Sequence, residues 1–192
     1  MIDARVVPVL TVSDADAAER ACRALLAGGL TTVEITFRTA AAADAIRRAS
    51  AIEGLTVGAG TVLSEEQLGA AIEAGASFAV APCTNPDVVA AARRAGIPFV
   101  PGAATPTEID RARSLGCEVV KIFPAATVGG PAFLRAVSAV FPDLKYIPTG
   151  GITAENVADY LAVPSVLACG GTWITAAADG IEERARAASV AA

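Results

Sequence analysis

The chain has 192 residues, of which 54% are hydrophobic, and a mean hydropathy of +0.53, which suit one domain with a sizeable core. Its formal net charge of −5 and isoelectric point near 4.8 argue against nucleic acid as a partner, because phosphate backbones are held by basic surfaces. The chain contains no histidine, which excludes a Ser-His-Asp triad, a Cys-His dyad and a histidine-ligated metal.

No apolar run approaches the ~18 residues of a membrane span, and residues 1–5 resemble no signal peptide. We therefore expect no membrane partner and a cytoplasmic location. Cys22, Cys83, Cys117 and Cys169 form no CxxC pair, so we expect buried thiols rather than disulfides or a zinc site.

Short apolar runs alternate with helical patterns along the whole chain. The predicted strands cover residues 6–10, 32–37, 56–60, 78–81, 97–101, 118–124, 146–148 and 166–168. The predicted helices cover about residues 15–27, 39–49, 64–75, 85–96, 105–116, 129–140 and 153–160, with a last helix inside 174–188. Several helices begin at a Ser, Thr or Asn cap and end at glycine.

This alternation predicts the fold class. Strands that alternate with helices pair in parallel and have both faces of the sheet covered. Eight strand–helix units indicate a single α/β domain over residues 1–192, a closed (β/α)8 or TIM barrel. A doubly wound open sheet is the alternative. In the barrel, the active site lies where strands end and the following loops begin.

Lys121 is one of only two lysines and lies within the apolar run of residues 118–124. A lysine buried in a strand loses hydration, which disfavours its ammonium form, and a neutral amine is a nucleophile. The structural alternative is a lysine that reaches the strand end or pairs with a carboxylate. Lys145, the other lysine, precedes its strand and is expected on the opposite, solvated face.

The second predicted strand carries a polar row. Glu34, Thr36 and Arg38 alternate with apolar neighbours, so the period of two places them on one side of the strand, facing the barrel interior. A buried Glu34–Arg38 ion pair is the structural interpretation. The functional interpretation is a carboxylate base beside a guanidinium that binds a substrate carboxylate.

Glycines follow or end three other strands. Thr61 follows residues 58–60 (GAG), where its hydroxyl and nearby N–H groups could bind a carboxylate. Two further pairs, Gly150–Gly151 after the seventh strand and Gly170–Gly171 before Thr172 after the eighth, are expected to lead into helix N-termini. Such N-termini on these two strands recur as phosphate sites in the barrel.

As a set, these motifs resemble the 2-keto-3-deoxy-6-phosphogluconate (KDPG)/4-hydroxy-2-oxoglutarate (KHG) aldolase family. The matching segments occur in family order: residues 7–9 (VPV), 33–39 (VEITFRT), 58–62 (GAGTV), 100–102 (VPG), 121–125 (KIFPA), 148–152 (PTGGI) and 170–173 (GGTW).

The resemblance implies a class I aldolase that needs no metal or cofactor, is usually a homotrimer, and acts on a phosphorylated 2-keto acid. By resemblance, Lys121 would form a Schiff base with the C2 ketone and Glu34 would shuttle protons through water. The other roles implied are the substrate carboxylate for Arg38 and Thr61, the pocket wall for Pro82 and Phe123, and the phosphate for Gly150, Gly151, Gly170, Gly171 and Thr172.

The chain departs from the family pattern in three places. Only five residues precede the first strand, where a longer N-terminal helix is common; Cys83 replaces a usual Gly, which could narrow the pocket; and Thr172 replaces a common Ser. Two other functions stay open: a phosphate-binding isomerase or epimerase in which Lys121 is only an electrostatic group, and a non-catalytic oligomeric scaffold.

Overall fold

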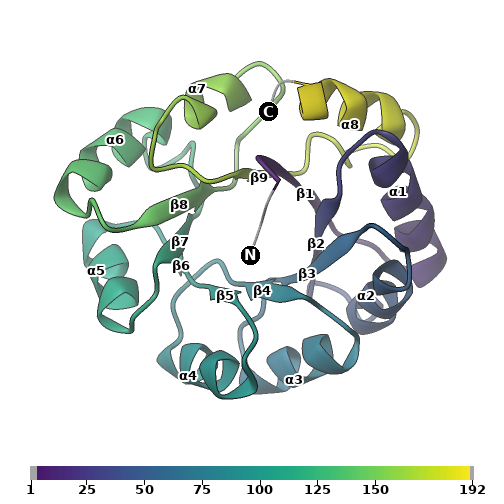
Figure 1. The fold of residues 1–192 in the computed structure, drawn as a ribbon, viewed down its shortest axis with the longest axis horizontal. Coiled ribbons are helices and arrows are strands. Elements are labelled where there is room, and N and C mark those ends of the chain that lie inside the picture. Colours follow the sequence, from purple (N-terminus) through teal and green to yellow (C-terminus); the bar gives the residue numbers. More distant parts are fainter. Residues whose placement is uncertain (1–3, 191–192) are drawn as a thin grey trace.

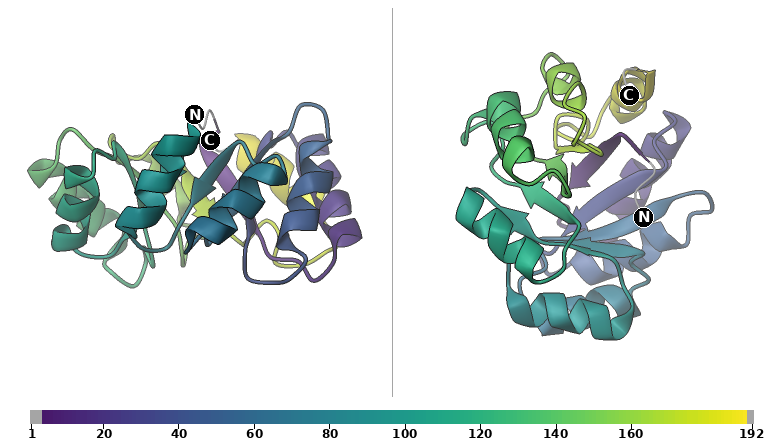
Figure 2. Two further views of the ribbon diagram at one scale, coloured as in Figure 1. Left: turned by 90° about the horizontal axis from the view of Figure 1, so that it is seen from below. Right: turned by 60° about the vertical axis from the view of Figure 1, so that its left-hand side comes forward.

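The structure, a computed structural model, describes residues 4–190 and has an α/β architecture. Its parallel strands curl around a common centre, and the helices cover them from outside (Figure 1, Figure 2). The strands are β1 (Val6–Leu10), β2 (Thr32–Thr36), β3 (Thr56–Gly60), β4 (Phe78–Val80), β5 (Phe99–Val100), β6 (Gly102–Ala103), β7 (Val119–Ile122), β8 (Lys145–Pro148) and β9 (Cys169–Gly171). The helices are α1 (Ala15–Ala27), α2 (Ala42–Ser50), α3 (Glu65–Glu73), α4 (Pro86–Ala95), α5 (Pro106–Ser114), α6 (Gly130–Val140), α7 (Val157–Leu161) and α8 (Ile181–Val190).

Hydrogen-bonded ladders group the strands into two parallel sheets, ordered β5-β4-β3-β2-β1-β9 and β6-β7-β8. Only Pro101 separates β5 from β6, and its carbonyl accepts a hydrogen bond from the Lys121 N–H at 2.8 Å. At the other junction, isolated parallel bridges link Tyr146 to Val166 and Thr149 to Gly170. The strands thus form a curled parallel arrangement, but not one continuous eight-stranded ladder.

Two predicted strands are corrected. The fifth, expected over residues 97–101, covers only Phe99–Val100 (β5), because Pro101 has no N–H to donate to a ladder, and β6 follows beyond the predicted range. The eighth, expected over residues 166–168, lies at Cys169–Gly171, where it pairs in register with β1 from Val6 onward. Val166 makes only an isolated bridge. This shift places Gly170 and Gly171 inside a strand, not after one.

Three predicted helices also differ from the observed ones. The second begins at Ala42, three residues later than expected, and the last, α8, extends to Val190. The helix expected from residue 153 begins only at Val157, because the Thr153 N–H donates to Asn156 Oδ1 at 2.9 Å and holds a turn there. Elsewhere the sequence caps act as expected, for example at Thr105, which forms a capping box with Glu108.

Apolar side chains form two clusters, one on each side of the strands. The larger lies between strands and helices and includes Val33 and Ile35, both fully buried. The smaller joins Phe78, Val80, Val100 and Ile147. Since Ile147 pairs in register with Lys121, this smaller cluster faces the interior of the ring beside that lysine.

The cysteines are all free thiols. Burial raises the pKa of Cys22 and of Cys169 to about 12, which keeps both protonated. Cys117 is half-buried and Cys83 is exposed, so the expectation of buried thiols holds for only part of the set. Within residues 4–190, no helix is both long enough and apolar enough to cross a membrane.

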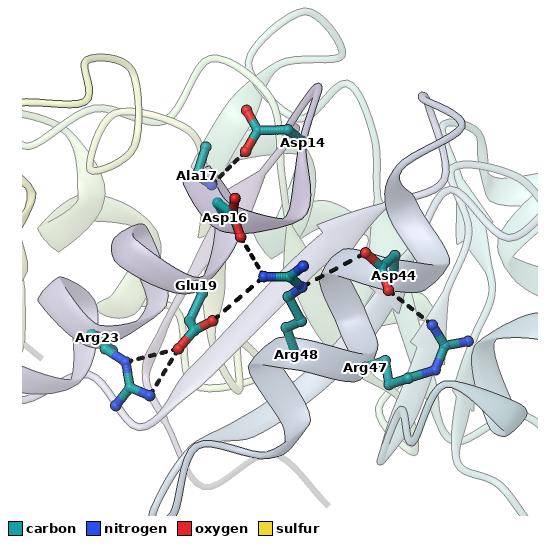
Figure 3. A network of polar contacts seen from close by, with 8 residues as sticks. All are labelled: Asp14, Asp16, Ala17, Glu19, Arg23, Asp44, Arg47 and Arg48. Atoms are coloured by element: carbon teal, nitrogen blue, oxygen red, sulfur yellow. Dashed lines mark hydrogen bonds and ion pairs between the residues drawn. The ribbon is translucent and has the colours of Figure 1, made fainter.

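A network of charges joins α1 to α2 on the outer surface (Figure 3). Arg48 of α2 contacts Asp16 of α1, and its guanidinium also lies 4.0 Å from Glu19 and 3.7 Å from Asp44. Arg47, by contrast, pairs with Asp44 alone, at 3.0 Å. The side chains are largely solvated, so water and salt screen these interactions.

We expect Arg48→Ala to lower the free energy of unfolding by about 0.5–1 kcal/mol, because Arg48 bridges the two helices. Arg47→Ala, which removes a single pair within one helix, should cost less. Urea denaturation at low and high salt measures both losses, and the loss for Arg48→Ala should shrink at high salt. Equal losses for the two variants would contradict a bridging role.

Candidate active site

A buried ion pair lies inside the ring of strands. Lys121 Nζ on β7 donates to Glu34 Oε1 at 2.9 Å and to Oε2 at 3.0 Å on β2. Only 5% of Lys121 and 4% of Glu34 is exposed. Removing one partner of such a pair leaves a buried charge uncompensated, which costs about 3–5 kcal/mol.

The period of two along β2 places Glu34 in this position. Val33 and Ile35 pack on the helix side, so Glu34 and Thr36 face the interior, as the polar row predicted. Arg38, two residues beyond β2, is exposed and makes no ion pair with Glu34; Lys121 is the partner instead. The structural interpretation of a Glu34–Arg38 pair is therefore wrong.

The contact bears out one alternative left open by the sequence, a lysine that pairs with a carboxylate, since the Glu34 carboxylate lies in direct contact with the amine. Only the neutral amine is a nucleophile, so a proton shared in this contact must leave Nζ before Lys121 can attack. Glu34 is within reach to accept that proton without an intervening water.

A cavity of about 210 Å³ opens beside this pair. Every residue assigned to the site from the sequence lines it except Gly170; the lining residues from that set are Glu34, Arg38, Thr61, Pro82, Lys121, Phe123, Gly150, Gly151, Gly171 and Thr172. Gly170 packs against Thr149 instead, since a Cβ at Gly170 would lie 2.4 Å from Thr149 Oγ1.

The glycines differ from the expected pattern in one further respect. Helix α7 begins six residues after Gly151 and α8 ten residues after Gly171, so neither glycine pair leads directly into a helix. The expected contribution of helix N-termini is therefore absent at these glycines. What remains at this end of the cavity are the backbone groups of Gly150, Gly151 and Gly171 and the hydroxyl of Thr172.

Arg38 and Thr61 come together at another part of the cavity wall. Arg38 Nε donates to Thr61 Oγ1 at 3.4 Å, and Arg38 keeps the rest of its guanidinium exposed. Thr61 has φ of 58°, an uncommon conformation for a β-branched residue. Strained backbone of this kind often occurs at binding sites.

Three further lining residues, Val9, Thr149 and Ile152, were not assigned from the sequence. Thr149 Oγ1 is buried and has no hydrogen-bond partner among the described residues, so its hydroxyl is available to a bound molecule. Its position directly before Gly150, at the end of β8, was the signal that could have identified it. Cys83, expected to narrow the pocket, is exposed and is not part of the lining.

Among residues 4–190, no group of three or more His, Cys, Asp or Glu is arranged to hold a metal ion. The fold and cavity together define an α/β protein of parallel strands with a buried lysine–carboxylate pair at its centre. The chain belongs to the KDPG and KHG aldolase family, whose model matches residues 1–188.

Relatives agree with this assignment. The chain is 47% identical over 174 residues to the 2-dehydro-3-deoxy-phosphogluconate aldolase of Pseudomonas aeruginosa, covering 90% of this chain and 79% of the relative. The crystal structure of a KDPG aldolase from Zymomonas mobilis superposes with a TM-score of 0.95 at 36% identity, covering 99% of this chain and 94% of the other.

A second solved structure bears on the chemistry of the family. It is the KDPG aldolase of Legionella pneumophila, described as holding pyruvate captured at low pH as a covalent carbinolamine intermediate. Its TM-score with this chain is 0.91 at 34% identity, and the match covers 97% of this chain and 95% of that one.

Proposed function

We propose that this chain is a Schiff-base-forming class I aldolase that cleaves KDPG to pyruvate and glyceraldehyde 3-phosphate. The observation that carries the proposal is the buried Lys121–Glu34 contact of 2.9 Å beside a cavity, in a chain of this family. The cleavage of KHG to pyruvate and glyoxylate is a second reaction of the same site. No metal or cofactor takes part.

The reaction begins at the carbonyl. Lys121 transfers a proton to Glu34, and its neutral Nζ attacks C2 of the substrate to give a carbinolamine. Glu34 returns the proton to the departing hydroxyl group, so that water leaves, an iminium forms and Glu34 is again a carboxylate. The iminium accepts the electron pair of the C3–C4 bond as that bond breaks. Glu34, as carboxylate, takes the proton of the C4 hydroxyl, directly or through water, and the aldehyde leaves.

The second half of the reaction regenerates the enzyme. The enamine that remains on Lys121 is protonated at C3, and Glu34 is the acid in reach. Water then adds to the pyruvate iminium, and pyruvate leaves as Lys121 regains its amine. One carboxylate thus serves alternately as base and acid, and its proton returns at each step.

The rest of the cavity holds the two charged ends of the substrate. Arg38 and Thr61 bind the pyruvate carboxylate, because a guanidinium and a hydroxyl suit an anion at this exposed mouth. Gly150, Gly151, Gly171 and Thr172 bind the phosphate through backbone N–H groups and one hydroxyl. Pro82 and Phe123 form the wall between them, and Gly170 supports the phosphate end from the strand.

The two other functions are not favoured. An isomerase or epimerase needs no covalent lysine, and a scaffold needs no buried ion pair, which costs desolvation energy to maintain. The aldolase names of the relatives agree with the proposal instead.

Borohydride trapping tests the proposal. We expect the chain, incubated with pyruvate and borohydride, to gain the mass of one reduced pyruvate unit on Lys121, located by peptide mass spectrometry. Parallel kinetics on KDPG and KHG show which substrate is preferred. No adduct, or an adduct only on another amine, would overturn the function.

We expect Arg38→Ala to raise KM for the keto acid by about 10–100-fold and to change kcat less. The reason is that a charge-assisted contact contributes about 1.5–3 kcal/mol to binding of the ground state and the transition state alike. Steady-state kinetics measure the two effects separately. A selective loss of kcat would instead assign Arg38 to the chemical step.

Four broader features belong to the same proposal. The two sheets form parts of one closed (β/α)8 barrel, in which the isolated bridges of β8 and the Pro101 junction complete the ring. Residues 1–192 form a single domain.

The chain assembles as a homotrimer, as the family resemblance implies. Light scattering measures its mass in solution, and a monomer would contradict this. The cytoplasmic location stays a prediction.

A further inference from the structure

The space occupied by the Glu34 carboxylate is the space that a side chain at position 60 would fill. A Cβ placed on Gly60, the last residue of β3, would lie 2.2 Å from Glu34 Oε1, 2.6 Å from Cγ and 2.8 Å from Cδ. Carbon atoms in contact prefer about 3.5–4.0 Å. Glu34 therefore lies against the bare backbone of Gly60, between β3 and Lys121.

The backbone conformation does not explain the glycine. Gly60 is not among the positive-φ glycines of residues 4–190, so alanine could adopt the same backbone angles. The strand is also anchored there: Gly60 pairs in register with Thr36, and its carbonyl accepts from the Phe37 N–H at 2.7 Å. Because β3 cannot easily move away, a side chain at position 60 would displace Glu34.

Displacement of Glu34 would act directly on the ion pair. Both carboxylate oxygens accept from Lys121 Nζ, and the atom closest to the added Cβ is one of these two oxygens. Glu34 is only 4% exposed but lines the cavity, so a displaced carboxylate would move into that space and out of its present position at Lys121 Nζ. A shift of about 1 Å in a catalytic group can cost on the order of 100-fold in rate.

We propose that Gly60 is a positioning residue, whose missing side chain lets the Glu34 carboxylate reach Lys121. This inference rests on the proposed function. Gly58, two residues earlier on the same face of β3, has a different neighbour, since a Cβ there would lie 2.1 Å from the Phe78 ring. The missing side chain at Gly58 thus leaves room for the Phe78 ring in the apolar interior. The missing side chain at Gly60 leaves room for the Glu34 carboxylate, which transfers protons.

A double-mutant cycle tests the assignment with four chains: parent, Gly60→Ala, Glu34→Ala and the double variant. We expect Gly60→Ala to lower kcat, and the rate of deuterium exchange into the pyruvate methyl group, by about 100-fold. In the Glu34→Ala background the same change should have little further effect, because no carboxylate remains to be displaced. Equal losses in both backgrounds, or parental rates in Gly60→Ala, would overturn the assignment.

Melting temperatures of the four chains show whether a loss of activity comes from a folding defect. Gly60→Ala should lower the melting temperature in the parent background and not when Glu34 is Ala. If Gly60→Ala does not fold, the double variant must; a double variant that also fails to fold would overturn the steric argument. Gly69→Ala on α3, where a Cβ would meet nothing within 4 Å, is the control and should keep parental activity.

The two proposals fail in different ways. A parent chain that forms no borohydride adduct with pyruvate would refute the aldolase function, whatever Gly60 does. An active parent whose Gly60→Ala variant exchanges deuterium at the parental rate would refute the role of Gly60 alone.

Discussion

Lys121→Arg should abolish aldol cleavage while leaving the chain folded. Arginine keeps a positive charge and N–H donors for Glu34, but its guanidinium stays protonated and forms no imine. The loss should be on the order of 10⁴-fold or more, because every later step depends on the covalent intermediate. Cleavage assays and borohydride trapping measure it, and both should fall to their detection limits.

Two comparison variants separate chemistry from stability. Lys121→Met also removes the amine but leaves Glu34 buried without a partner, so it should be less stable than Lys121→Arg by up to about 3–5 kcal/mol. Lys145→Arg replaces the only other lysine, which is exposed at the start of β8, and should keep parental activity. Cleavage at a parental rate by Lys121→Arg would exclude a Schiff base at this position.

Glu34→Gln should separate imine formation from turnover. Glutamine is close in size to glutamate and can still accept a hydrogen bond from Lys121, but it cannot carry a proton between substrate atoms. We expect pyruvate still to be trapped on Lys121, more slowly than in the parent because the acceptor of the lysine proton is gone, while kcat falls by about 10²–10⁴-fold, the usual contribution of a general acid–base group. The substitution also leaves the buried Lys121 without its counter-charge, so stability should fall by up to about 3–5 kcal/mol.

Glu118→Gln is the matched control for this variant. Glu118 is exposed and directly precedes β7, at the end of that strand away from the cavity, so its charge should not affect turnover. Parental kcat in Glu34→Gln would show that another group, or water, carries the proton.

Local patterns were sufficient for much of the fold. Strand β1, strand β3 and helix α1 lie within the residues that the sequence predicts, because each depends on neighbours in the chain: apolar alternation, a capping Asp14, and glycines that end the helix. Prediction was less accurate for β9, since its start depends on pairing with β1, more than 150 residues away in the chain. Local preferences cannot determine such a register.

The candidate site likewise has features that the sequence predicts and others that only the structure shows. Alternation along β2 indicated that Glu34 and Arg38 share a face, but it could not show that Glu34 pairs with Lys121 and not with Arg38. That choice depends on how the strands curl, which brings together two residues 87 positions apart. The same curvature excludes Gly170 from the cavity and adds Thr149.

The sequence by itself determined the alternation of strands and helices, a lysine in an apolar strand, and motifs specific enough to indicate the family. These features depend on residue type and spacing alone. Only the tertiary structure decided that the lysine pairs with Glu34, and that the carboxylate fits because Gly60 has no side chain. The physical reason is that charge pairing and steric clearance depend on distances between strands that are remote in the chain.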